Sequence, residues 1–522
     1  MRSDRKPFRP RRLAVECLEA RNLLSGASLV ALPLAARTTA GAGSSPPITN
    51  PTIVGYTPSQ IRAAYGFDQL TTFSTSSGSE PANGAGQTIA IVDAYNDPNI
   101  GGDLAVFDAA FGIAAPPSFK IVSQTGSTRL PLGNPGWDTE ISLDVEWAHA
   151  IAPGANILLV ETTSDRWSDL IAGVDYAKNQ PGVSVVSMSW DVSEYRIETA
   201  TDSTFTTAAN HPVTFVAASG DYGSPPEYPA TSPNVLSVGG TTLNLAAGGG
   251  YGSETAWSGS GGGVSSIEKE PAYQEDAQNT GYRGNPDVAY DADPNTGVAV
   301  YDTIDDRYGT GWAEIGGTSA GAPQWSALLA IADEGLAAAG KPALAQAQAR
   351  LYSLPANAFH DITSGGNGTY SAGTGYDAVT GLGSPVANVL INDLINGVTG
   401  SPTGVSNLGP DDFEFDARFA GNAVYTVASP RFDSGAVPQS GANPSVEIPQ
   451  FIGAKQVDAV VQTSLSAALP NLQMTKFGSE DDADNVADNG TVNPDNASID
   501  LVVLDASVDA CWSSRFSVPP TR

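Results

Sequence analysis

Short, continuously apolar segments alternate with segments of helical character through the middle of this 522-residue chain. The apolar segments cover residues 87–92, 157–160, 183–190, 213–218 and 235–238, and the helical ones cover residues 104–111, 167–177 and 198–210. Strands that are apolar throughout are buried on both faces, as in parallel sheets whose strands are joined by helices. The alternation therefore predicts an α/β fold with a mainly parallel sheet and helices on both faces.

Functional sites in such folds lie beyond the C-terminal ends of the strands, so polar residues at those ends are candidates. Asp93 ends the first apolar segment, and Asp221 follows a later one in the sequence Ser219-Gly220-Asp221. An aspartate in this position can form an Asx turn. Alternatively, a carboxyl group that stays protonated there can donate a hydrogen bond to a negatively charged oxygen.

The segment 316–323 has the sequence GGTSAGAP and is followed by an apolar run from Trp325 to Ala332. This pattern predicts a tight turn that opens a core helix, with Ser319 at the helix N-terminus. Unpaired N–H groups at that end suit a negative oxygen that forms beside the serine. Taken alone, the segment fits a structural turn as well as it fits a nucleophilic serine.

A serine nucleophile needs a base, and this chain offers few histidines for that role. The three histidines are His149, His211 and His360, and none stands in a His-Gly-Thr-His type of sequence. The sequence therefore gives little support for a histidine-based triad. Carboxylates become the candidate bases.

Glu140 and Asp144 form a candidate pair because they are four residues apart in a segment of helical character, 137–150. That spacing puts both side chains on one face of a helix, one turn apart. A buried pair shares a proton, which raises one pKa and suits a general base at acidic pH. An exposed pair is instead an ordinary, solvated acidic helix face.

Composition sets further limits on function. The chain is 41% hydrophobic, which is enough for a sizeable core, and its formal net charge is −31. Nucleic-acid binding requires basic patches, so nucleic acid is excluded as a partner. The only cysteines, Cys17 and Cys511, stand near opposite ends of the chain and exclude a disulfide framework.

Several separated motifs, taken together and in this order, resemble the sedolisin family of serine-carboxyl peptidases. They are YTP at 56–58, AYG at 64–66, E-x-x-x-D at 140–144, SMSW at 187–190, SGD at 219–221, PDV at 286–288, GTS-x-x-x-P at 317–323, DITSG at 361–365 and G-x-G-x-D at 373–377. The similarity covers residues 51–398. It implies a subtilisin-like α/β architecture, in agreement with the alternation of strands and helices.

The resemblance implies a catalytic role for each matching polar residue. Ser319 would be the nucleophile, and Glu140 would be the general base that later returns a proton to the leaving amine. Asp144 would hydrogen-bond Glu140 and hold it in place. Asp221 would bind the oxyanion together with the backbone N–H of Ser319. Asp93 falls where subtilisins keep their triad aspartate, and we leave it outside the catalytic set.

The resemblance also implies sites for substrate and metal. The substrate backbone would lie along three residues, of which the last replaces the glycine usual in the family: Ser189, Trp190 and Asp191. One Ca²⁺ ion would be bound by two side chains, those of Asp361 and Asp377, and by the backbone carbonyls of Ile362, Gly373 and Gly375. Calcium prefers several oxygen ligands, including carbonyls from a glycine-rich turn. The alternative is two aspartates in ordinary loops.

The N-terminal region predicts an export leader followed by a linker. Residues 1–12 are strongly basic, residues 28–36 are mainly apolar, and residues 40–52 are rich in Gly, Ser, Pro and Thr. LEARNLLS at 18–25 resembles the LEPR-x-LL-S type of leader on surface and secreted proteins of planctomycete bacteria, with Ala20 in place of proline. Pro33 interrupts the short apolar part, which makes a stable membrane span a poor fit. The alternative is a disordered basic tail.

We therefore expect an export leader and linker at 1–50, a peptidase domain at 51–398, and an acidic, partly disordered extension at 399–522. The expected protein is a secreted or cell-surface serine-carboxyl endopeptidase, monomeric, active in acid and acting on polypeptides. Family members usually carry a large N-terminal pro-domain, whereas fewer than sixty residues precede the expected peptidase domain here. The alternative is accordingly a catalytically silent, sedolisin-like surface binding module.

Overall fold

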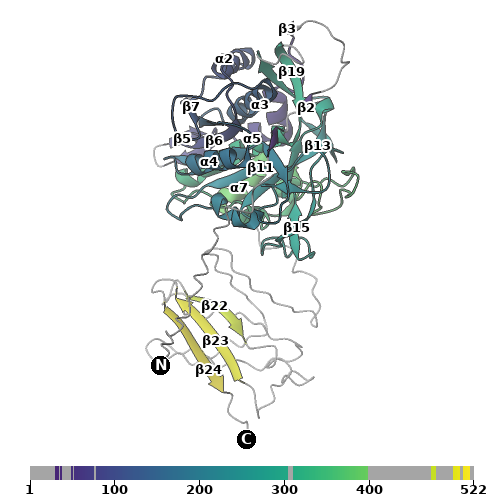
Figure 1. Ribbon diagram of the computed structural model, residues 1–522. Coiled ribbons are helices and arrows are strands. Elements are labelled where there is room, and N and C mark those ends of the chain that lie inside the picture. Colours follow the sequence, from purple (N-terminus) through teal and green to yellow (C-terminus); the bar gives the residue numbers. More distant parts are fainter. Residues whose placement is uncertain are drawn as a thin grey trace, which may run out of the picture. The chain divides into compact units, whose positions relative to one another are not determined.

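The computed structural model describes residues 30–33, 36–37, 49–50, 52–75, 78–303 and 310–397, and the backbone of three strands nearer the C-terminus. The chain divides into two compact units, residues 1–399 and 400–522 (Figure 1). In the second unit, β22 (Leu472–Phe477), β23 (Ser498–Asp505) and β24 (Ala510–Ser517) form an antiparallel sheet. These strands fall in the region predicted as an acidic, partly disordered extension, most of which lies outside the described residues.

An eight-stranded sheet forms the centre of the first unit. Its strands are β6 (Thr88–Ala94), β7 (Phe119–Ser123), β8 (Asn156–Thr162), β9 (Val183–Met188), β11 (Thr214–Ala218), β13 (Val235–Leu245), β14 (Tyr251–Ala256) and β17 (Val288–Asp291). The order is β14-β13-β11-β9-β6-β8-β7, and β17 also pairs with β13. Every pair is parallel except β13 with β14. The predicted mainly parallel sheet is confirmed.

Alternate residues of the central strands face two different cores. In β6, Ile89 and Ile91 belong to one apolar cluster, and Ala90 and Val92 belong to the other. The first cluster also takes in α1 (Pro58–Tyr65), α2 (Ile100–Phe111), α3 (Pro135–Ile151), α5 (Thr318–Ala338), α6 (Gln348–Leu351) and α7 (Ala387–Asn396). The second takes in α4 (Trp167–Lys178). Helices therefore cover both faces, as predicted.

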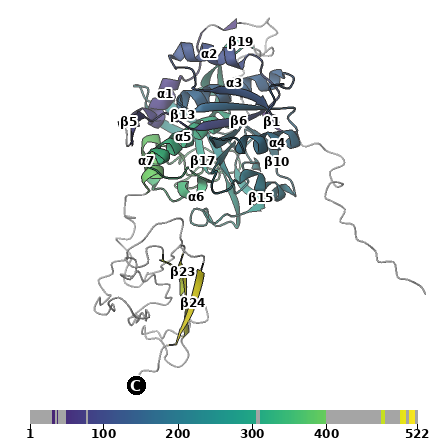
Figure 2. The ribbon, with the colours of Figure 1, turned by 90° about the vertical axis from the view of Figure 1, so that its left-hand side faces the viewer.

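Smaller sheets complete the first unit. Their strands are β1 (Leu32–Pro33), β2 (Ala36–Arg37), β3 (Thr49–Asn50), β4 (Thr72–Thr75), β5 (Gly78–Pro81), β10 (Trp190–Ser193), β12 (Glu227–Tyr228), β15 (Gly263–Lys269), β16 (Tyr282–Asn285), β18 (Val298–Asp302), β19 (Thr310–Gly316), β20 (Phe359–His360) and β21 (Ser384–Pro385). Strands β1, β2 and β3 come from the region predicted as leader and linker, yet they pair with β10 and β19. Figure 2 labels β1 and β10, which form an antiparallel pair.

One local prediction was wrong. The helix predicted at 198–210 is only a pair of short 3-10 turns, Glu198–Ala200 and Asp202–Phe205. This segment is rich in Thr, Ser and Asp, whose side chains bond the local backbone, as when the Thr206 hydroxyl donates to the Ser203 carbonyl at 2.8 Å. The glycine- and serine-rich segment 248–263 contains β14, because the long strand β13 offers its edge for antiparallel pairing.

Candidate active site

Ser319 is the second residue of α5, which begins directly after β19. The turn uses Gly317, whose φ of 107° lies in a region that side chains rarely adopt. A Cβ on Gly321 would lie 2.8 Å from Val238, so the glycine lets the helix pack closely against the sheet. Ser319 is buried, and its Oγ has no hydrogen-bond partner among the described residues. A buried hydroxyl at a helix N-terminus is well placed for the predicted nucleophile.

Helix α3 carries the two predicted carboxylates and is buried on nearly all sides. It begins after Asn134, whose side chain accepts a hydrogen bond from the N–H of Gly136 at 2.9 Å. Glu140 and Asp144 both have no exposed side-chain surface. The Ser189 hydroxyl donates to Asp144 Oδ1 at 2.8 Å. The alternative of a solvated acidic helix face is therefore wrong.

Burial and neighbouring charges raise the pKa of the Asp144 carboxyl group. Burial raises the pKa of Asp144 well above its usual value, and the charges of Asp93 and Glu140 raise it further. Burial also raises the pKa of Asp93 to about 7. Neither carboxylate oxygen of Asp93 has a hydrogen-bond partner among the described residues. Asp93 and Asp144 thus keep their protons in acid, next to Glu140.

Asp221 is tied to the start of α5 through Thr318. Its Oδ1 accepts from the backbone N–H of Thr318 at 2.7 Å and from the Thr318 hydroxyl at 2.9 Å. Burial raises the pKa of Asp221 to about 7, although these hydrogen bonds oppose the rise. Asp221 is therefore protonated in acid, and it is hydrogen-bonded to Thr318, the residue before Ser319. The hydrogen bonds to Thr318 explain the position of Asp221 without an Asx turn.

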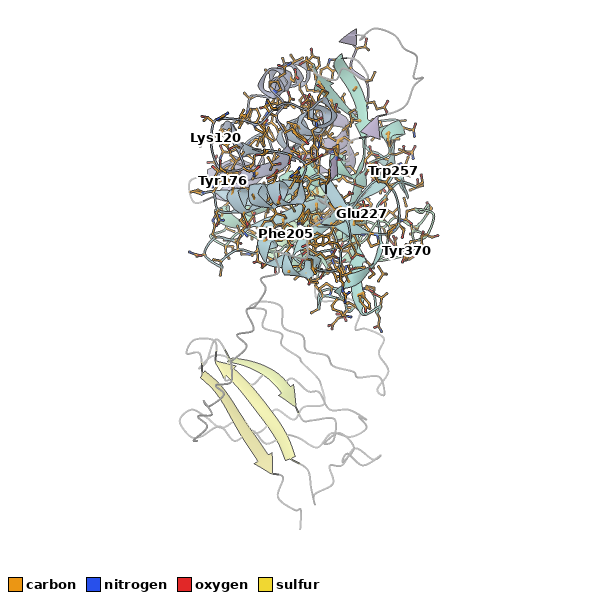
Figure 3. All side chains as sticks on the ribbon, viewed as in Figure 1. Lys120, Tyr176, Phe205, Glu227, Trp257 and Tyr370 are labelled. Carbon is orange, nitrogen blue, oxygen red and sulfur yellow. The ribbon has the colours of Figure 1, made fainter. Side chains whose placement is uncertain are left out.

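The strand β10, expected to bind substrate backbone, carries a second carboxyl group close to Asp221. Trp190 is anchored by its indole N–H, which donates to the carbonyl of Val92 at 2.7 Å. Burial raises the pKa of Asp191 well above its usual value, and a hydrogen bond with Glu227 adds to the rise. Glu227 is labelled in Figure 3.

Asp191 and Glu227 converge on the backbone just before Asp221. A Cβ on Gly220 would lie 2.7 Å from Glu227 Oε2 and 3.1 Å from Asp191 Oδ2. The charge of Glu227 contributes to the raised pKa of Asp221. Sequence reasoning missed both Glu227 and Thr318 as members of this site. Thr318 stood beside the predicted nucleophile, but no sequence signal pointed to Glu227.

The predicted calcium residues form a separate loop. Asp377 Oδ2 accepts from the N–H of Gly373 at 3.0 Å, and Asp361 accepts from the N–H of Gly375 at 3.1 Å with both oxygens. Ile362 stands next to Asp361 and is buried. Two carboxylates thus meet one glycine-rich turn, a donor set that fits calcium when carbonyls complete it. Among the described residues, no group of three or more acidic, His or Cys side chains converges as a metal site.

Comparisons with known proteins agree with this architecture. A model of the subtilase family of peptidases matches residues 136–353. Kumamolisin from Bacillus sp. (strain MN-32) is 37% identical over an alignment of 380 residues, and the match covers 65% of this chain and 64% of kumamolisin. Sedolisin from Pseudomonas sp. (strain 101) is 33% identical over an alignment of 328 residues, and the match covers 54% of this chain and 53% of that protein. The chain is thus similar to members of the sedolisin family and, over residues 136–353, to the subtilases.

A solved structure of Pseudomonas sedolisin, a serine-carboxyl proteinase complexed with two molecules of pseudo-iodotyrostatin, is also similar. It has a TM-score of 0.56 and 28% sequence identity, and the similarity covers 65% of this chain and 98% of that one. The chain spans somewhat less than two thirds of kumamolisin and about half of the curated sedolisin. None of the helices that the structure describes is both long enough and apolar enough to cross a bilayer.

Proposed function

We propose that this chain is an acid-acting serine-carboxyl endopeptidase that hydrolyses polypeptides outside the cell through an acyl-enzyme on Ser319. The observation that supports this most is the link through Thr318, which fixes the Asp221 carboxyl against the helix start that carries Ser319. The buried carboxyls of Glu140 and Asp144 supply the base that the histidines do not.

In the proposed first step, Ser319 Oγ attacks the carbonyl carbon of the scissile peptide bond, and its proton passes to Glu140. Asp144 retains its own proton because its pKa is raised by burial and by the charges of Asp93 and Glu140, and it keeps Glu140 oriented. The C–N bond then breaks, and Glu140 returns the proton to the departing amine. Water repeats the sequence on the ester and restores the serine.

Negative charge develops on the carbonyl oxygen during attack, and protonated Asp221 donates a hydrogen bond to it in this proposal. The backbone N–H of Ser319 is the second donor. Asp221 can donate only while it is protonated, so oxyanion binding weakens as the pH rises through about 7. Activity is therefore limited to acid.

We expect the wild-type protein to cleave a denatured protein substrate at acidic pH and to lose this activity as the pH rises above about 7, because Asp221 then loses its proton. Gel analysis of the substrate from about pH 3 to pH 8 measures cleavage as a function of pH. A peptide-aldehyde inhibitor should block cleavage by forming a hemiacetal with Ser319. A neutral or alkaline optimum would contradict the carboxyl mechanism. Folded protein that neither cleaves substrate nor binds the aldehyde would favour the silent binding module.

The loop of Asp361 and Asp377 is proposed to hold one Ca²⁺ ion, which would supply a fixed positive charge that joins the two carboxylates. Removing calcium with a chelator is then expected to lower the melting temperature by several degrees, because the two negative charges lose their common partner. Asp377→Asn protein should already melt at the lower temperature and should respond little to the chelator. Calorimetry with and without chelator measures both; identical responses of the two proteins would remove the calcium assignment.

A further inference from the structure

The segment between β14 and β15, residues 257–262, lies against the backbone that leads to Asp221, and we call it the linking loop. The N–H of Gly261 donates to the carbonyl of Gly220 at 2.7 Å, and the hydroxyl of Ser219 donates to the carbonyl of Gly261 at 2.7 Å. These two bonds hold both of the residues that directly precede Asp221. The position of Asp221 therefore depends on where the linking loop lies.

Two consecutive glycines bring the linking loop against two different segments. A Cβ on Gly261 would overlap the carbonyl oxygen of Ser219, and a Cβ on Gly262 would overlap the carbonyl oxygen of Ala378. Such close approaches of backbone to backbone are open only to glycine. The linking loop is thus packed between the end of the strand that leads to Asp221 and the turn that contains Ala378.

The turn that contains Ala378 is closed by the side chain of Asp377. Oδ1 of this carboxylate accepts from the N–H groups of Val379 and Thr380, both at 2.9 Å. Oδ2 accepts from the hydroxyl of Thr380 at 2.9 Å. Val379 and Thr380 have no exposed surface. The turn is therefore a fixed, buried support for the linking loop.

One side chain of the linking loop, that of Ser260, fastens it to this support. Ser260 is fully buried, and its hydroxyl donates to the carbonyl of Val379 at 2.8 Å and accepts from the N–H of Gly240 in β13 at 2.8 Å. A hydroxyl has one proton to donate, so both roles are filled at once. Ser260 directly precedes Gly261, whose N–H holds Gly220, so loss of the hydroxyl would loosen that contact.

The backbone that the linking loop holds also meets the start of α5. The N–H of Gly220 donates to the hydroxyl oxygen of Thr318 at 3.1 Å, and the same hydroxyl donates to Asp221 at 2.9 Å. A shift of Gly220 would therefore move Asp221 through the chain and disturb the helix start through Thr318. Both proposed oxyanion donors, the Asp221 carboxyl and the N–H of Ser319, lie within reach of that shift.

We propose that Ser260 is a positioning residue for the oxyanion: it fastens the linking loop to the turn of Asp377 and so fixes where Asp221 meets the developing charge. This inference rests on the proposed function. Ser260 acts only through Gly261 and Gly220 and has no contact with the reacting atoms. The oxyanion exists only along the reaction path, so a displaced donor should lower kcat and leave KM nearly unchanged.

Ser260→Ala tests this role, because it leaves the carbonyl of Val379 and the N–H of Gly240 without their buried partner. We expect kcat for a fluorogenic peptide at about pH 4 to fall about tenfold, less than the loss that follows complete removal of an oxyanion donor. KM should stay within about twofold of wild type. Ser260→Cys keeps a weaker donor and acceptor and should lose less, and it provides the test if the alanine variant does not fold.

Ser237→Ala is the matched control. Ser237 lies in β13 and is equally buried, but its hydroxyl has no hydrogen-bond partner among the described residues. The same substitution there removes the same atom without releasing the linking loop, so kcat should stay within about twofold of wild type. Equal kcat values for the folded Ser260→Ala and Ser237→Ala proteins would overturn the inference.

A pair of ligands separates positioning from a general structural effect. A peptide aldehyde forms a hemiacetal with Ser319 and places an oxygen in the oxyanion position, whereas the corresponding peptide alcohol forms no such bond. Ser260→Ala should weaken aldehyde binding about tenfold and change alcohol binding by less than about twofold, with circular dichroism as the check on folding. Equal weakening of both ligands would overturn the inference alone, whereas wild-type protein without turnover or aldehyde binding would overturn the proposed function.

Discussion

Ser319→Ala and Glu140→Gln proteins are each expected to lose turnover by a factor on the order of 10⁶, the size seen when a serine peptidase loses its nucleophile or its base. Alanine removes the only oxygen that can form the ester, and glutamine cannot accept the proton that Ser319 must release. Both residues are fully buried, and both changes keep or reduce side-chain volume. Hydrolysis of a fluorogenic peptide at about pH 4 measures the loss.

Glu146→Gln is the matched control for the base. Glu146 lies on the same helix, is equally buried, and accepts a hydrogen bond from the backbone N–H of Tyr301 at 3.0 Å. A glutamine oxygen can accept the same bond, and nothing places this side chain at the reacting atoms. We expect kcat/KM within about threefold of wild type. If Glu140→Gln retained turnover comparable to the control, Glu140 would not be the base.

The parts of the site that depend on local spacing were predictable from the sequence. The i, i+4 spacing of Glu140 and Asp144 requires a shared helix face once the helix forms, and the glycines around Ser319 require a tight turn. The central strands were predictable for a similar reason, since apolar residues on both faces leave few alternatives to a buried parallel sheet. Whether the carboxylates were buried could not be read from α3, because its surroundings come from distant segments.

The contacts that depend on distant segments were not predictable. Asp191 and Glu227 are 36 positions apart, and they meet because β10 pairs with β12, with Ser193 opposite Glu227. No pattern in the residues around Glu227 predicts its contact with Asp191. The pairing of β1 with β10 has the same character, because two-residue strands have no detectable period.

Tertiary hydrogen bonds explain the error at 198–210. The apolar residues there suggested a helix, but Asp202 accepts hydrogen bonds from the hydroxyls of Tyr228 and Ser232, at 2.9 and 2.7 Å. These tertiary bonds hold the segment in short turns and override a weak helical preference.

The folded protein is expected to lose stability as the pH rises from about 4 to about 8. Burial raises the pKa of Asp93, Asp97 and Asp333 to about 7 and that of Glu161 to about 8. The folded state therefore binds more protons than the unfolded state between the ordinary carboxyl pKa, about 4, and these raised values. The stabilising contribution is complete below about pH 4 and is lost as the pH rises through the folded-state pKa values.

Each such carboxyl lowers the free energy of unfolding by about 1.4 kcal/mol per pH unit within its window, so several together should lower the melting temperature by about 10 °C or more. Calorimetry at about pH 4, 6 and 8 measures the change. Asp333→Asn isolates one contribution away from the active site, because an amide oxygen can still accept the N–H of Leu344, now at 2.7 Å, without titrating. This variant should lose less stability than wild type over the same interval and keep its activity in acid. A melting temperature that stayed constant or rose toward pH 8 would mean that these carboxyls titrate near their ordinary values, and the acid-limited design proposed for Asp221 would lose its physical basis as well.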